Sequence, residues 1–114
     1  MTSPQQAKGG KWEREVLSFL RTHGFPRAYR ARQEGYNDVG DIHAGGFVLQ
    51  AKDWLRWTDA IREGLDGAVV QAENANAAMG TGMLPAAVVK RARHGVGDAY
   101  VVMRLADFVR FMGR

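Results

Sequence analysis

The stretch that most constrains the fold is FVLQAKD, residues 47–53, which follows the glycine pair Gly45-Gly46. Its run of apolar residues after a turn signal predicts a strand in a core, entered through a hairpin. Side chains two residues apart share one face of a strand. The two faces are expected to carry Val48, Gln50, Lys52 and Trp54 on one side and Phe47, Leu49, Ala51 and Asp53 on the other. An amide and an ammonium group between apolar neighbours indicate either a polar site or the solvent-facing side of an edge strand.

Hydrophobic periodicity and turn residues predict the element order α-β-β-β-α-β-β-α. The expected helices are residues 8–23, 57–79 and 105–112, and the expected strands are residues 27–32, 39–43, 47–53, 84–91 and 99–104. We therefore expect an α/β fold with a mixed central sheet flanked by helices. Residues 1–7 are polar and predict a disordered N-terminal tail, and residues 8–114 are expected to form a single domain.

Composition and charge narrow the class of protein and its partners. The 114 residues include no cysteine, which excludes disulfides and a thiolate metal site. The first residues lack the apolar run of a signal peptide, and no segment has the length of a membrane span, so we expect a cytoplasmic protein without a membrane partner. The net charge of +4 favours an anionic partner such as nucleic acid.

Two carboxylates are candidates for chemistry. Glu13 has helical spacing with Val16, Leu17 and Leu20, the residues expected to pack on the sheet. A carboxylate on that face either lies at its solvent edge or points into a site. Asp41 follows Gly40 in the expected second strand, and its alternative interpretation is an ordinary turn aspartate.

Together with Gln50 and Lys52, these acids form a pattern suited to metal-assisted hydrolysis of phosphodiesters. Carboxylate and carbonyl oxygens bind a hard cation such as Mg²⁺. The cation polarises the phosphate and lowers the pKa of a bound water. A lysine can orient that water and stabilise the charge that develops on the phosphate.

The motif GDI…FVLQAK resembles that of the PD-(D/E)XK nuclease superfamily, with Asp41 as the first acid and Gln50-Ala51-Lys52 in place of Glu-X-Lys. The opening KGGKWEREVLSFLRTHGF is similar to the first helix of archaeal-type Holliday-junction resolvases. YNDVGDI and AENANA resemble small actinobacteriophage proteins called resolvases or endonucleases. The resemblance covers residues 8–54 well and rests on the strand-strand-helix pattern after residue 84.

The resemblance implies a restriction-endonuclease-like core and a Mg²⁺-dependent endodeoxyribonuclease, with Mn²⁺ as an alternative metal. By position, Glu13, Asp41 and Gln50 would bind the metal, and Lys52 would be the catalytic lysine. Arg14 and one of Arg30 or Arg32 would contact phosphate. It also implies a homodimer that acts on four-way or other branched DNA, in the host cytoplasm if the protein is phage-encoded.

The departure from the family pattern is Gln50, where most members have Glu. The amide keeps a carbonyl ligand but removes a unit of charge beside the metal. We therefore keep three alternatives: a non-catalytic nucleic-acid-binding module on the same fold, a nuclease or nickase for other DNA structures, and a basic dimeric structural protein.

Basic residues gather in two parts of the chain and predict contacts to DNA phosphates. The predicted contacts are Lys8, Lys11, Arg14, Arg30, Arg32, Lys90, Arg91 and Arg93. Such contacts would position DNA without reading its sequence. Trp54 and Trp57 are expected to pack in the core or in a dimer interface, with stacking on exposed bases as the alternative. His43 is expected to be incidental.

Overall fold

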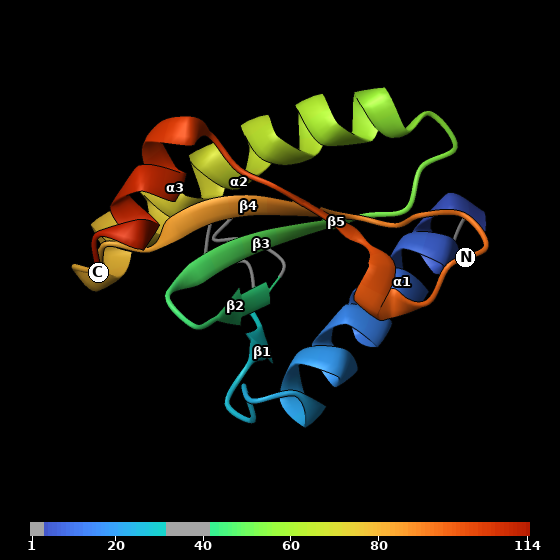
Figure 1. The fold of residues 1–114 in the computed structure, drawn as a ribbon, viewed down its shortest axis with the longest axis horizontal. Helices are drawn as coiled ribbons and strands as arrows, with labels where there is room; N and C mark the ends of the chain where they lie inside the picture. Colours follow the sequence, from blue (N-terminus) through green and yellow to red (C-terminus); the bar gives the residue numbers. More distant parts are fainter. Residues whose placement is uncertain (1–3, 32–41) are drawn as a thin grey trace.

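The described residues form three α-helices, one short 3₁₀-helix and a five-stranded sheet (Figure 1). This computed structural model describes residues 4–31 and 42–114. In chain order the elements are α1 (Pro4–Thr22), β1 (Tyr29–Arg30), β2 (Ile42–Ala44), β3 (Phe47–Lys52), α2 (Trp57–Met79), β4 (Leu84–Val89), η1 (Val96–Asp98), β5 (Tyr100–Val102) and α3 (Leu105–Met112). The predicted order is confirmed, and so is the α/β class.

The helix α1 begins four residues earlier than expected, at Pro4, so residues 4–7 are helical and only residues 1–3 of the predicted tail lie outside the described residues. Proline suits the first turn of a helix, because the amide it lacks would have no partner there. The outer strands are shorter than expected: β1 has two residues and β5 has three. Both stand at the edges of the sheet, where pairing comes from one side only.

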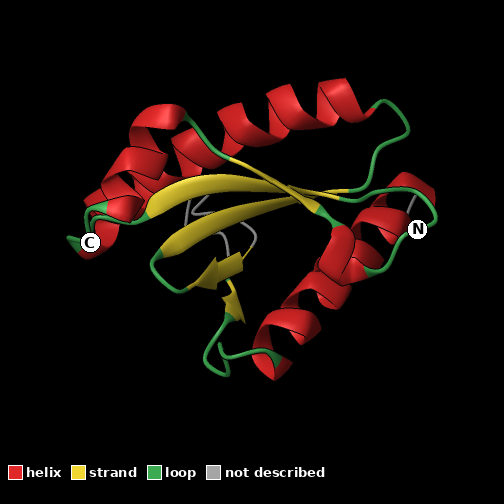
Figure 2. Ribbon diagram, viewed as in Figure 1, coloured by secondary structure: helices red, strands yellow, loops and turns green. Residues whose placement is uncertain are grey.

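The strands follow the order β1-β2-β3-β4-β5 across the sheet (Figure 2). The pairs β1–β2, β2–β3 and β4–β5 are antiparallel, whereas β3 and β4 are parallel, so the sheet is mixed. A parallel pair needs a long crossover connection, and α2 provides it. As a result β3 and β4 end at the same edge of the sheet, with Lys52 opposite Val89.

Pro85 lies inside β4, where a proline would usually interrupt the ladder. The amide of Leu84 donates to the carbonyl of Gly46 on the β3 side, at 2.9 Å. Successive amides of a strand point to opposite sides, so the missing amide of Pro85 faces the β5 side. There the pairing with β5 begins only at Ala87, and no ladder bond is lost.

The two long helices cover opposite faces of the sheet (Figure 1). On the α1 face, Trp12, Val16 and Leu17 pack with Leu49 and Ala51 of β3. The side chain of Trp12 is buried, and its Nε1 donates to the carbonyl of Val88 at 3.2 Å, which fixes α1 to the sheet.

On the α2 face, small residues let the helix approach the strands closely. Val48 packs with Ala72 and Ala75, and Ala60 packs with Ala87 and Val89. The alternation predicted for β3 is therefore confirmed: Val48 faces α2, and Leu49 and Ala51 face α1. In the described ranges 4–31 and 42–114, every helix is too short or too polar to cross a membrane.

Candidate active site and nucleic-acid interface

Gln50 and Lys52 project from the same face of β3, as their spacing predicts, and α2 covers that face. Gln50 pairs with Ala87 and Lys52 with Val89, and both of these β4 residues pack against α2. A Cβ atom on Gly64 of α2 would lie 3.0 Å from Cγ of Lys52, and one on Gly67 would lie 3.9 Å from Cδ of Gln50. The two polar side chains are thus held between the sheet and α2, and neither lies on an open strand face.

Gln50 carries a buried acceptor. The residue is 9% exposed, and its Oε1 has no hydrogen-bond partner among residues 4–31 and 42–114. A buried polar atom without a partner costs free energy, on the order of 1–3 kcal/mol, so it is uncommon without a reason. The oxygen is therefore suited to receive a water, a cation or a ligand donor.

The ammonium group of Lys52 lies over the ring of Trp54, 4.9 Å from the ring centre. Among the described residues, no carboxylate forms an ion pair with it. A cation–π contact of this kind contributes about 0.5–2 kcal/mol and leaves the positive charge uncompensated. Lys52 therefore presents a partly buried positive charge on the same strand face as Gln50, two residues along β3, which suits an anion such as phosphate.

Glu13 lies on α1, which packs on the opposite face of the sheet from Gln50 and Lys52. Its carboxylate accepts a hydrogen bond from Nε of Arg30 on β1 and forms an ion pair with it. The expectation that residues 13, 16 and 17 share the sheet-facing side of the helix holds, because Glu13 is half-buried beside Val16 and Leu17. The strand period, however, cannot tell which helix covers which face. The structure consequently does not bring Glu13 together with Gln50 and Lys52.

Three predicted residues fall wholly or partly outside what the structure describes. Asp41 and Arg32 lie in residues 32–41, and the side chain of Lys8 is also outside the described part. In the part that is described, no group of three or more His, Cys, Asp or Glu side chains could hold a metal ion.

The described basic residues lie in different settings. Lys11 is an exposed residue paired with Glu15 at 3.9 Å, and Arg14 is also exposed. Lys90, directly after β4, lies 3.8 Å from Asp53 and 5.7 Å from the ring centre of Trp12. Lys90 therefore stands at the same edge of the sheet as Lys52, because β3 and β4 end together.

The turn after β4 carries the other two predicted contacts. The guanidinium of Arg91 lies 4.9 Å from the ring centre of Tyr100. Arg93 is exposed and has a positive φ of 65°, which is uncommon for a residue other than glycine. The turn thus directs Arg93 into solvent, where it can contact an anion.

Three aromatic residues near this edge, Trp54, Trp57 and Tyr100, are exposed. Trp54 and Trp57 are 38% and 53% exposed, so the core interpretation of both is wrong for the single chain. Tyr100, which the sequence analysis did not single out, lies 6.3 Å from Trp57 between ring centres. A sequence signal was present, because a tyrosine opens the strand that pairs with β4 next to a basic turn.

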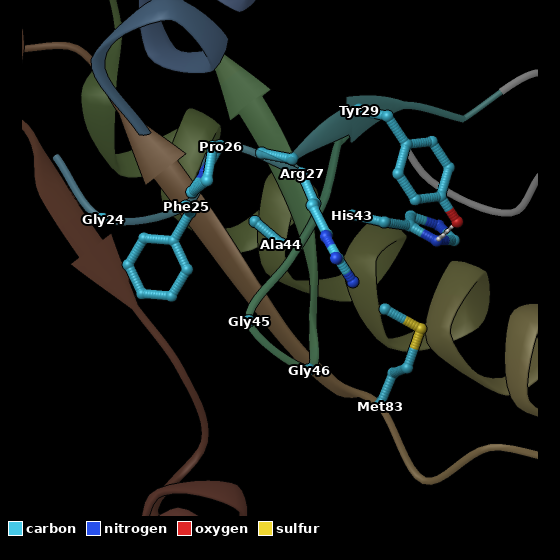
Figure 3. Close-up of a pocket in the computed structure, with 11 residues that line it drawn as sticks. Gly24, Phe25, Pro26, Arg27, Tyr29, His43, Ala44, Gly45, Gly46 and Met83 are labelled. Atoms are coloured by element: carbon cyan, nitrogen blue, oxygen red, sulfur yellow. Dashed lines mark hydrogen bonds between the residues drawn. The ribbon is translucent and has the colours of Figure 1, made fainter. Parts of the chain in front are cut away.

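A hollow of about 380 Å³ lies at the end of the sheet opposite to Lys52, around the Gly45-Gly46 turn (Figure 3). In Figure 3, the rings of Tyr29 and His43 lie together on one side, and the Tyr29 hydroxyl is 3.0 Å from Nδ1 of His43. His43 opposes Val48 at the start of β3 and is buried. The histidine thus has a structural partner, in keeping with its expected incidental role.

No family model, no curated protein and no solved structure matches this chain. The function must therefore be argued from the residues and their arrangement.

Proposed function

We propose that this chain is a metal-dependent DNA endonuclease with a restriction-endonuclease-like core, of the Holliday-junction resolvase type and acting on branched DNA. The observation that carries the proposal is the pair Gln50–Lys52 on one face of β3. It combines a buried carbonyl oxygen without a described partner and an ammonium group without a described carboxylate. The pair stands where the parallel strands β3 and β4 end, which is the edge at which α/β sheets commonly bind ligands.

The Gln50 oxygen fits a hard cation, which prefers oxygen ligands. The described residues offer no cluster of carboxylates, and Glu13 lies on the opposite face of the sheet, so the proposal assigns the acidic ligand to Asp41. A bound Mg²⁺ or Mn²⁺ would polarise the scissile phosphate and lower the pKa of a bound water.

Lys52 would act on the substrate directly. Its ammonium group donates hydrogen bonds to the nonbridging phosphate oxygens and stabilises the negative charge that builds up on them. A partly buried position strengthens this interaction, because less water screens it. Gln50 would hold one ligand position by its carbonyl and leave one unit of negative charge fewer beside the metal than glutamate would.

The test uses a labelled four-way junction and a matched linear duplex, each with Mg²⁺, Mn²⁺ or EDTA. We expect symmetric nicking of the junction, lost in EDTA and in the variants Lys52→Ala and Asp41→Asn. Arg62→Ala is the control, because it removes an exposed cation of α2 whose described partner is Asp59. Full activity of Lys52→Ala would remove Lys52 from the mechanism, and nicking of the duplex alone would favour the nickase alternative.

A non-catalytic DNA-binding module is the second candidate. Two observations favour it: Gln50 is uncharged, and the carboxylate of Glu13 is engaged with Arg30. Tight junction binding without cleavage under either metal would support this candidate.

We also propose a homodimer, which would suit the two-fold symmetry of a four-way junction. The support is an apolar surface on α3, whose eight residues include five large exposed hydrophobic side chains: Leu105, Phe108, Val109, Phe111 and Met112. Exposed apolar surface of this extent on so short a helix is typical of an interface.

A further inference from the structure

The edge of the sheet that carries Lys52 also carries a row of paired positions across three strands. Lys52 of β3 pairs with Val89 of β4, and Val89 pairs with Tyr100 of β5. Paired residues project on the same face, so Lys52 and Tyr100 both face α2, two strand spacings or about 10 Å apart. The amide of Lys90 donates to the carbonyl of Lys52 at 3.0 Å, which extends the ladder past the end of β4.

Aromatic rings flank this row. Trp54 follows β3, Trp57 is the first residue of α2, and Tyr100 is the first residue of β5. We call these three residues the aromatic platform. Each is 38% exposed or more, and Trp57 lies next to Tyr100. Three large rings exposed at one edge of a small domain indicate a binding surface.

Positive charge accompanies the rings. Lys52 lies over Trp54 and Arg91 over Tyr100, each at 4.9 Å from the ring centre. Ring faces beside cations suit a partner that has flat π-systems on an anionic backbone. Nucleic acid has both features, since its bases stack on aromatic rings and its phosphates pair with lysine and arginine.

The platform also favours unpaired over paired nucleotides. In a duplex the bases are already stacked on their neighbours, and their faces are closed to a protein ring. A segment with unpaired bases offers those faces and loses no base pair on binding. Stacking is indifferent to sequence, because every base has a π-face.

We propose that the aromatic platform binds unpaired nucleotides, with Trp57 and Tyr100 stacking on bases and Arg91 holding an adjacent phosphate. The assignment deepens the proposed function and rests on it for the placement of the scissile strand beside Lys52. It specifies the substrate class as branched DNA with an unpaired segment next to the cleaved bond. A perfectly paired junction would be a poorer substrate.

Fluorescence anisotropy in EDTA tests the proposal without cleavage. The probes are a labelled single-stranded oligonucleotide, the same strand with a run of abasic sites, and a matched duplex. We expect Trp57→Ala and Tyr100→Ala each to weaken binding of the single strand about 5- to 100-fold, the range expected for the loss of one stacked base. Binding of the duplex and of the abasic strand should change by less than about twofold.

Matched variants separate stacking from folding and charge. Trp57→Phe and Tyr100→Phe keep a ring and should retain most of the affinity. Phe25→Ala is the aromatic control, because Phe25 is as exposed as Tyr100 but lies against Gly45, at the other end of β3. It should leave all three affinities unchanged.

Two results would overturn the proposal: unchanged single-strand binding in both alanine variants, or an equal loss on the abasic strand. A platform that docks a protein partner would give the first of these. Absence of cleavage by the wild-type chain with either metal would instead contradict the nuclease assignment. A loss of affinity in the alanine variants for the single strand but not for the abasic strand, measured in EDTA, would still establish the platform.

Discussion

Gly64 of α2 faces Lys52 of β3 so closely that a Cβ atom on the glycine would lie 3.0 Å from Cγ of the lysine. The same atom would lie 3.2 Å from Cβ of Ala87, which is fully buried on β4. The helix therefore rests directly on the lysine stem, and the position of the ammonium group depends on the absence of a side chain at residue 64.

Gly64→Ala should destabilise the chain by about 1–3 kcal/mol, because the added methyl overpacks a site closed on two sides. Gly67→Ala in the same helix is the matched control. Its Cβ would have its nearest contact at 3.9 Å, so the better helix propensity of alanine should stabilise the chain by up to about 1 kcal/mol. Urea unfolding measures both. Equal effects of the two variants would contradict the close packing around Lys52.

Gln50→Glu should tighten metal binding and raise cleavage in Mg²⁺, because a carboxylate restores a unit of negative charge beside the cation. Calorimetric titration with Mg²⁺ and Mn²⁺ measures the affinity. In the absence of metal the same variant should lower stability, since an unpaired carboxylate would replace a neutral amide at a buried position. Unchanged metal affinity would show that residue 50 is not a ligand.

Lys90→Gln and Arg91→Gln should each reduce the slope of log binding constant against log salt by about 0.7–0.9, the change expected when one phosphate contact is lost. Arg62→Gln is the control. It removes an exposed charge on α2 that pairs with Asp59, and the slope should not change. If all three variants bind with the wild-type slope, the end of β4 is not a contact surface.

Asp107 on α3 should be a source of stability that depends on its arginine partners. Its side chain is 2% exposed, accepts a hydrogen bond from Nε of Arg104 at 2.6 Å, and lies 3.6 Å from Arg110. Arg104→Ala should cost about 1–3 kcal/mol, because it leaves a buried carboxylate short of a partner. Asp107→Asn in that background should recover part of the loss, and a double-mutant cycle measures the coupling. Additive effects of the two substitutions would contradict a coupling between Arg104 and Asp107.

The same pair predicts a simple pH dependence. The hydrogen bond that Arg104 donates to the carboxylate of Asp107 raises the pKa of Arg104 above its ordinary value. A group whose pKa is raised on folding stabilises the protein below its unfolded pKa and loses that effect only as pH rises through the folded value. The contribution of Arg104 should therefore be constant through neutral pH and fall in strongly alkaline solution.

The apolar surface of α3 predicts self-association. Leu105→Asp with Val109→Asp should convert a dimer to a monomer, because the charges would enter an apolar interface. Light scattering coupled to gel filtration measures the mass. Val70→Asp on α2, at a site as exposed as Val109, is the control and should leave the mass unchanged. A wild-type chain that is monomeric at micromolar concentration would contradict the dimer.

Local patterns predicted much of the fold because they are local in origin. The bounds of α2 and α3 agree with the expected residues 57–79 and 105–112, and the alternation along β3 gave the correct faces for Val48 and Leu49. Helix periodicity and strand alternation are properties of neighbouring residues, so they can be read from one segment at a time.

The arrangement of the site could not be read in the same way. Which helix covers which face of the sheet depends on the path of the whole chain. Because of that path, Glu13 pairs with Arg30 and Lys52 packs against α2. Trp54 and Trp57 are exposed because no other segment of the described residues covers them, and a local sequence pattern does not carry this information. Asp41 and Arg32 lie outside the described residues, and their roles stay predictions.

The parallel pairing of β3 with β4 has a consequence for folding. Lys52 and Lys90 become neighbours only after the 23-residue helix α2 has returned the chain to the edge where β3 begins and β4 has run back alongside β3. Contacts that join distant segments form late, because a long loop must close before they are gained. A fragment that ends after β3 would contain the whole Gln50–Lys52 motif and lack the surface around it. The sheet edge at which β3 and β4 end should therefore be among the last parts to form during folding. It should also be among the first to be lost when α2 detaches from the sheet.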